Sequence, residues 1–210
     1  MKRIPFYYLL IYFMKSALLI FLIGLVFLSS CMDSNDPVPK GTQLLANTNL
    51  SANPSSVSPW NAVSSPGFDL GVSQEVFRSG FQSIFIENLD SLNENAGTWR
   101  QTYSGVLPRE GRNLILKTHI KGEDIKLRGP GSNVYISIRA FPVEDNNGST
   151  IGRFVTSQNR TLVSGSFDWE PLEITLSSVP EQVDFIIVYL VMGPRVTGRV
   201  YFDDITLTVK

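Results

Sequence analysis

The chain has 210 residues, of which 43% are hydrophobic and 18% charged, and its formal net charge is -1. Removal of an N-terminal leader would leave about 180 residues, which suffices for one well-packed domain. Lysine and arginine are scattered along the chain, so it lacks the concentrated basic surface that nucleic-acid binding requires, and we expect no nucleic-acid partner. The 12 Pro, 16 Gly and 13 Phe favour a turn-rich, all-β protein.

The N-terminus has the pattern of a secretory leader. Lys15 stands before a run over 17–28 that is apolar apart from one glycine and is too short to span a membrane comfortably. A further apolar stretch precedes Met14, so translation starts either there or at Met1 with an unusually long leader. Under both alternatives, residues 1–30 are a signal peptide and lie outside the folded domain.

The leader ends in Leu28-Ser29-Ser30-Cys31, which resembles a bacterial lipobox. The resemblance implies a diacylglycerol on the Cys31 thiol, cleavage before this residue, and a membrane anchor of two or three acyl chains such as palmitate. The alternative is an uncleaved signal-anchor helix with an incidental cysteine. Met32 stands where enteric lipoproteins retained at the inner membrane carry Asp. We therefore expect an outer-membrane lipoprotein, either periplasmic or exposed at the cell surface.

The region after the leader is polar and proline-bearing and has no apolar period. Residues 31–43 are therefore expected to comprise the lipidated cysteine and a flexible tether, followed by one folded domain over 44–210. Cys31 is the only cysteine, so the sequence excludes an intramolecular disulfide.

Period-two alternation of apolar and polar residues predicts strands over most of the domain. In Asn113–Lys121, Leu114, Leu116 and Ile120 share one face; in Asn133–Phe141, Val134, Ile136 and Ile138 do the same. Further strands are predicted at 82–88, 98–104, 154–156, 172–176, 183–191 and 199–209. Turn sequences such as Arg128-Gly129-Pro130-Gly131 separate them, and no amphipathic helix is evident. The sequence thus predicts an all-β jelly-roll sandwich of two antiparallel sheets.

The order of several motifs resembles that of a known family. Ser79-Gly80-Phe81-Gln82-Ser83 leads into a strand, Trp99 lies in the next strand, and the chain closes on Phe202-Asp203-Asp204-Ile205-Thr206-Leu207. This order resembles the calcium-associated jelly-roll carbohydrate-binding modules, within the wider galactose-binding-like sandwiches, over residues 44–210. The resemblance implies a membrane-anchored, non-catalytic lipoprotein that binds a poly- or oligosaccharide.

The same resemblance implies a structural calcium ion, a hard cation that prefers oxygen ligands. Ser79, Gly80, Asp203 and Asp204 match the positions that hold the ion in the family. The family's early Phe-Glu dipeptide, which supplies a further carboxylate, is missing, and its place is taken by Leu50-Ser51-Ala52-Asn53. This loss would weaken the site. The alternative is that both aspartates only bond neighbouring backbone groups.

Candidate ligand-binding residues are aromatic and polar side chains on the strand faces opposite the core. They are Trp99, Gln101, Tyr103, His119, Tyr135, Arg139 and Phe141. Aromatic rings would stack on the apolar face of a pyranose, and the polar groups would bond its hydroxyls. On the strand that carries Trp99, the alternation does not settle which side chains point away from the core. If the opposite face is the outer one, Arg100 and Thr102 point outward instead. The strands of His119 and Tyr135 would form one groove if they lay side by side.

Two other function classes remain open. Jelly-roll glycoside hydrolases carry Glu-x-Asp-x-x-Glu, because a pair of carboxylates must flank the scissile bond, whereas Glu87, Asp90 and Glu94 have a different spacing. His119 lies one residue off the Gln-x-His pattern of alginate-type lyases, and a single histidine excludes a histidine-rich zinc site. We therefore expect no enzymatic activity. The remaining alternative is a structural or protein-binding surface lipoprotein on the same scaffold.

Overall fold

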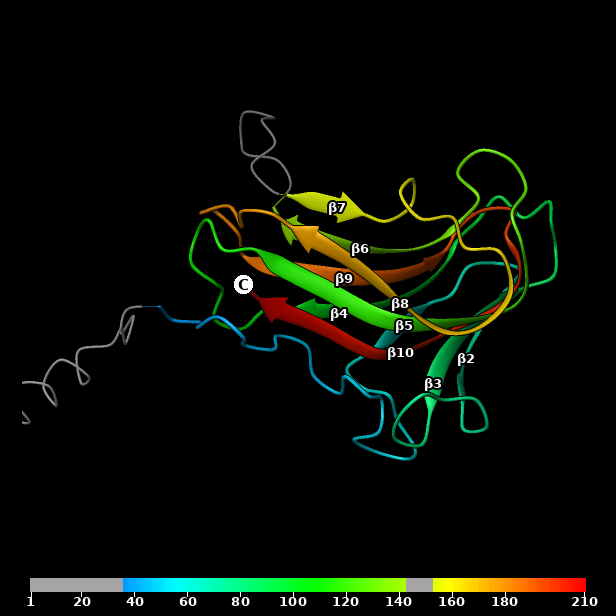
Figure 1. The fold of residues 1–210 in the computed structure, drawn as a ribbon, viewed down its shortest axis with the longest axis horizontal. Coiled ribbons are helices and arrows are strands. Elements are labelled where there is room, and N and C mark those ends of the chain that lie inside the picture. Colours follow the sequence, from blue (N-terminus) through cyan, green and yellow to red (C-terminus); the bar gives the residue numbers. More distant parts are fainter. Residues whose placement is uncertain (1–35, 143–152) are drawn as a thin grey trace, which may run out of the picture. The chain divides into compact units, whose positions relative to one another are not determined.

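The structure is a computed structural model that describes residues 36–142 and 153–210, and these residues form ten strands and no helix (Figure 1). The strands are β1 (Asn61–Val63), β2 (Phe68–Ser73), β3 (Ser83–Asn88), β4 (Gly97–Tyr103), β5 (Leu114–Lys126), β6 (Val134–Phe141), β7 (Phe154–Thr156), β8 (Gly165–Leu176), β9 (Phe185–Met192) and β10 (Thr197–Val209). The predicted leader and Cys31 lie outside the described residues. In the part that is described, no helix is long and apolar enough to cross a membrane.

The strands form two five-stranded sheets. One has the order β1-β4-β9-β6-β7 and the other the order β2-β3-β10-β5-β8, and we call them the β9 sheet and the β10 sheet after their central strands. Every pairing of neighbouring strands is antiparallel. The predicted jelly-roll sandwich of two antiparallel sheets is therefore confirmed.

All eight strands predicted from the sequence are present, but two are longer than predicted and two others were missed. β8 begins at Gly165 instead of Leu172, and β5 continues to Lys126 because its last residues pair with the start of β10. The missed strands, β1 and β2, lie at the outer ends of the two sheets. β1 has three residues and buries none of them, and β2 is interrupted by Gly71, so neither has a strong alternating pattern.

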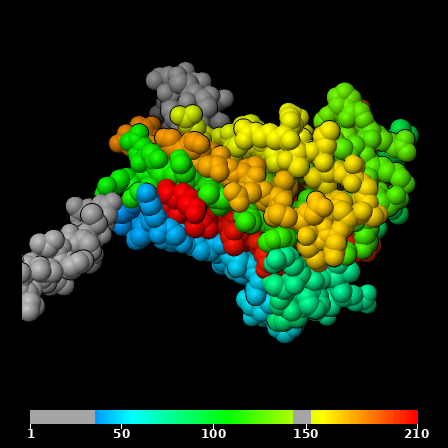
Figure 2. All heavy atoms as spheres, viewed as in Figure 1, coloured from blue at the N-terminus to red at the C-terminus, as the bar shows by residue number. Residues whose placement is uncertain are grey.

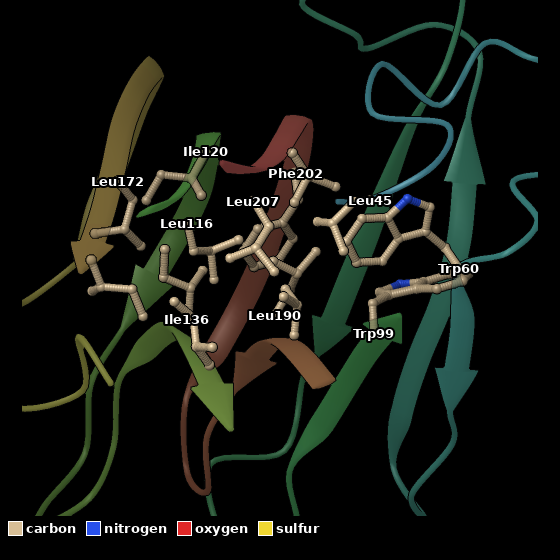
Figure 3. Packing of buried hydrophobic residues seen from close by; sticks show 14 of the residues in the cluster. Leu45, Trp60, Trp99, Leu116, Ile120, Ile136, Leu172, Leu190, Phe202 and Leu207 are labelled. Carbon is tan, nitrogen blue, oxygen red and sulfur yellow. The ribbon is translucent and has the colours of Figure 1, made fainter. Parts of the chain in front are cut away.

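The core fills the space between the two sheets (Figure 3). Leu116 and Phe202 point into it from the β10 sheet, while Ile136 and Leu190 point into it from the β9 sheet. Successive side chains of a strand alternate between the two faces of a sheet. The inward facing predicted for Leu114, Leu116 and Ile120 and for Val134, Ile136 and Ile138 is confirmed, because all six are at most 3% exposed.

Residues 41–44 lie along the second half of β10, which corrects the end of the predicted tether over 31–43; its residues 31–35 lie outside the described residues. β3 pairs only with the first half of β10, so the edge of the second half is open to another chain segment. The Gly41 amide donates to the Val209 carbonyl (2.8 Å), and the Val209 amide donates to the Thr42 carbonyl (3.0 Å). Figure 2 shows this segment as a blue band beside the red β10. The compact unit accordingly begins at Pro37 and not at residue 44.

Candidate functional site

The outer face of the β9 sheet carries a hollow of about 240 Å³. Its lining comes from β4, β6, β7 and β9 and the residues beside them: Ala96, Thr98, Tyr135, Ser137, Arg139, Phe154, Thr156, Gln158, Tyr189 and Val191. The volume lies somewhat below the roughly 300–1,000 Å³ of typical small-molecule pockets. The hollow therefore suits a short part of a ligand whose remainder runs over the sheet.

The register of the sheet brings these side chains together from strands far apart in sequence. Tyr189 on β9 lies opposite Ser137 on β6, and Ser137 lies opposite Thr156 on β7. In the next row, Arg139 on β6 lies opposite Phe154 on β7. Cross-strand neighbours on one face have Cβ atoms about 5 Å apart, so the two rows form a continuous surface.

The Arg139 guanidinium lies between two aromatic rings of this surface. Its central carbon is 4.9 Å from the centroid of the Phe154 ring and 5.7 Å from that of Tyr189. Such cation–π contacts use the flat faces of the guanidinium and leave the N–H groups at its edge available. None of the carboxylates in residues 36–142 and 153–210 forms an ion pair with Arg139.

Tyr135 provides a half-buried ring beside Arg139. Burial raises the pKa of the Tyr135 hydroxyl above its ordinary value, and the positive charge of Arg139 lowers it by a smaller amount. The hydroxyl is therefore protonated at neutral pH and can both donate and accept a hydrogen bond. The outward facing that the alternation predicts for Tyr135, Arg139 and Phe141 is confirmed, since their neighbours in β6 are buried.

Phe141 lies on the same face but does not line the hollow. Its ring stacks on Phe185 of the neighbouring strand, with the centroids 5.0 Å apart and the planes inclined by 12°. Two residues that sequence reasoning missed do line the hollow, Phe154 and Tyr189. The alternation of Ile186, Val188 and Leu190 was a signal for the outward facing of Tyr189; nothing in the short β7 singled out Phe154.

The structure corrects the three candidates on β4, which face the core. Trp99 is 5% exposed and its indole Nε1 donates to the Phe85 carbonyl (3.0 Å). Gln101 is 3% exposed, accepts a hydrogen bond from the Ala46 amide and donates one to the Ala46 carbonyl. Tyr103 packs against the edge of the core and its hydroxyl donates to the Val106 carbonyl (2.6 Å). The outward positions on this strand are instead those of Thr98, Arg100 and Thr102.

The predicted groove that joins His119 to Tyr135 is also wrong. His119 does point away from the core, but its strand β5 belongs to the β10 sheet whereas β6 belongs to the β9 sheet. The chain crosses from one sheet to the other through the predicted turn at Gly129–Gly131, where both glycines have positive φ. The two side chains therefore lie on opposite outer faces of the sandwich.

The four predicted calcium ligands come together beside His119, but in a hydrogen-bonded turn. Asp203 is 0% exposed, and its carboxylate accepts bonds from the amides of Arg78 (2.8 Å), Ser79 (3.0 Å) and Asp204 (2.7 Å). Asp204 bonds the Arg78 guanidinium and the Ser79 hydroxyl. Gly80 has a φ of 68°, and a Cβ there would overlap the Ser51 hydroxyl, so this position requires glycine.

This donor set does not fit a calcium ion. N–H groups and a guanidinium surround the two carboxylates, whereas Ca²⁺ requires oxygen atoms free to coordinate it. The buried Gln82 amide donates to the Leu50 and Asn53 carbonyls, which occupies further oxygens of the N-terminal segment. No group of three or more His, Cys, Asp or Glu side chains within 36–142 and 153–210 is placed to hold a metal.

Chelation tests the calcium prediction directly. We expect the melting temperature of the domain to be the same with and without EDTA, because hydrogen bonds of the chain itself satisfy Asp203 and Asp204. Differential scanning calorimetry measures this. A melting temperature that falls in EDTA and is restored by added Ca²⁺ would contradict the expectation and support the predicted ion.

Comparison with known proteins gives the fold and no family. No protein-family model matches the sequence, and no curated protein matches it. Solved structures do match: an apo-form cyclase from Fischerella sp. has a TM-score of 0.56 at 11% identity, covering 81% of this chain and 97% of the cyclase. The enzymatically active domain of tailspike protein 4 of bacteriophage CBA120 has a TM-score of 0.52 at 11% identity, over 80% of this chain and 21% of the tailspike chain.

Carbohydrate-binding modules are also among the matching structures. The module TmCBM61 in complex with β-1,4-galactotriose has a TM-score of 0.48 at 14% identity, over 80% of this chain and 99% of the module. At 11% identity, the likenesses to the cyclase and the tailspike domain show a shared fold alone, and a fold does not determine a function. The protein spans about a fifth of the tailspike chain it matches. Its function must therefore be argued from its own site.

Proposed function

We propose that the protein is a membrane-anchored lipoprotein that binds a glycan, without cleaving it, on the outer face of the β9 sheet. The observation that carries the proposal is the hollow in which Tyr135, Tyr189 and Phe154 surround Arg139. Rings stack on the apolar face of a sugar, and the guanidinium, hydroxyl and amide groups around them bond its polar substituents. Hydroxyls of Thr98 and Thr156 line the same hollow.

The chemistry of the lining supports binding without cleavage. Hydrolysis of a glycosidic bond commonly uses two carboxyl groups on either side of that bond. The described residues that line the hollow include no Asp or Glu, and the one charged side chain among them is that of Arg139. Such a set can orient a sugar but lacks the pair of carboxyl groups that this hydrolysis uses.

Replacement of Tyr135 with Ala tests the binding face. We expect the affinity for the bound glycan to fall by about 1–2 kcal/mol, or roughly five- to thirtyfold, since an aromatic contact is lost. Stability should change little, because Tyr135 does not belong to the buried cluster between the sheets. A glycan array identifies the ligand, and isothermal titration calorimetry on residues 37–210 measures the affinity.

The neighbouring residue provides the matched control. Ile136 is 0% exposed, so Ile136→Ala should destabilise the domain by about 2–5 kcal/mol while the folded fraction keeps its affinity. If Tyr135→Ala destabilised the fold as much as Ile136→Ala does, the ring would be part of the packing. Unchanged affinity in Tyr135→Ala would place the glycan elsewhere.

The membrane anchor rests on the lipobox-like Leu28-Ser29-Ser30-Cys31. Because acyl transfer requires the thiol, Cys31→Ser is expected to leave an unprocessed precursor that no longer partitions into detergent. Phase partition and metabolic labelling with a palmitate analogue measure this in cells that express the full chain. Normal labelling of the Cys31→Ser protein would remove the anchor from the proposal.

A further inference from the structure

Charge is divided unequally between the two sheets. Each strand of the β10 sheet carries at least one acidic residue, including Asp69, Glu87, Glu123, Asp168 and Asp203. The five strands of the β9 sheet, all of them described, contain no Asp, Glu, Lys or His. They contain two charged residues, and both are arginines. The β9 sheet is therefore the cationic side of a chain whose net charge is -1.

The two arginines, Arg100 and Arg139, both lie on the outer face of the β9 sheet. Each is exposed, and each faces outward in its strand. Three arginines elsewhere in the described residues bond oxygens of the chain: Arg78 bonds Asp204, Arg195 bonds the Pro130 carbonyl, and Arg199 bonds Glu87. Arg139 has aromatic contacts instead, which hold the guanidinium in place without neutralising its charge.

From this arrangement we infer that the ligand is an acidic saccharide, a glycan containing hexuronate units, whose carboxylate binds the edge of the Arg139 guanidinium. The inference rests on the proposed function and names its ligand class. The planar fork of arginine matches a carboxylate with two parallel N–H···O bonds. Tyr135 and Tyr189, which line the hollow with Arg139, would contact the sugar ring that bears the carboxylate.

The lining of the hollow opposes other ligand classes. A cationic ligand would meet the charge of Arg139 with no carboxylate from the described lining to offset it. A neutral glycan would leave the exposed guanidinium without an anionic partner, which forgoes its strongest available interaction. An acidic sugar uses both the aromatic rings and the charge.

The experiment compares polygalacturonate with the same polymer after methyl esterification, which keeps the sugar backbone and removes the charge. We expect residues 37–210 to bind polygalacturonate and to lose at least tenfold in affinity for the ester. Arg139→Gln should lower the affinity for polygalacturonate about ten- to hundredfold, in line with the loss of a charge-assisted hydrogen-bonded pair. Arg139→Lys, which keeps the charge but not the fork, should recover part of this loss. The matched control is Lys117→Gln, which removes one positive charge from the β10 sheet and should leave the affinity unchanged.

Each outcome separates the inference from the proposed function. Binding of neutral xylan or galactan as tightly as the acidic polymers would overturn the acidic ligand but keep glycan binding. Absence of binding to polygalacturonate, alginate, hyaluronate and all neutral polymers would overturn both. Equal binding of dextran sulfate, or equal losses in Arg139→Gln and Lys117→Gln, would indicate attraction by charge alone and would overturn the carboxylate contact.

Discussion

Replacement of Trp99 with Ala is expected to destabilise the domain by about 3–5 kcal/mol, the range found when a large aromatic side chain is removed from a core. Trp99 is 5% exposed, and its indole N–H bonds the Phe85 carbonyl of the opposite sheet, so the side chain connects the two layers. Figure 3 shows it with Trp60 at one end of the core. Urea denaturation followed by tryptophan fluorescence measures the loss.

Two variants separate packing from ligand contact at this position. Trp99→Phe keeps most of the buried ring and removes the N–H, so it should cost less than Trp99→Ala. Arg100→Ala changes the adjacent outward residue and should stay within about 0.5 kcal/mol of the wild type. A Trp99→Ala protein that kept full stability but lost glycan affinity would reverse this assignment and restore Trp99 as a ligand-binding residue.

Removal of the Asp203 carboxylate is expected to have the second large effect. Asp203→Ala leaves the amides of Arg78, Ser79 and Asp204 without their acceptor, and an orphaned buried donor costs about 1–3 kcal/mol. We therefore expect a loss of about 3 kcal/mol or more in the free energy of unfolding. Asp204→Asn is the control, because Asp204 and Arg78 form a partly exposed ion pair, and such pairs contribute about 0–1 kcal/mol. Equal losses in the two variants would contradict the special role of Asp203.

Asp203 also sets a pH dependence with a definite sign. Burial raises its pKa from 3.8 to about 6, although three N–H groups favour the charged form. The folded state therefore binds the proton more tightly than the unfolded state, and this contribution to stability is lost as the pH rises from about 4 to about 6. His119 acts in the opposite direction, because burial and the nearby Arg78 lower its pKa. In the His119→Gln background, the free energy of unfolding should fall as the pH rises over that range. Adding Asp203→Asn should make the free energy of unfolding nearly independent of pH there. If the slope stayed the same in the Asp203→Asn variant, the pH dependence would belong to another group.

The sequence determined which side chains share a face within each strand. Alternation over residues 113–121 and 133–141 predicted the inward leucines and isoleucines and the outward His119, Tyr135 and Arg139, and the structure agrees. This inference is local, because the pleat of a strand turns successive side chains to opposite sides whatever the strand pairs with. On β4 the same reasoning left two choices, since polar residues occupy both of its faces. There the contact between Trp99 and the opposite sheet decided the facing.

Tertiary structure alone decided which strands are neighbours. β5 and β6 follow each other in the chain but belong to different sheets, so His119 and Arg139 lie on opposite faces, while β4, β9, β6 and β7 meet to form the hollow. It likewise decided that the turn at Arg78 and Ser79 covers Asp203 and that residues 41–44 lie along the edge of β10. Pairing depends on hydrogen bonds between segments far apart in sequence, and no local period of the chain encodes them.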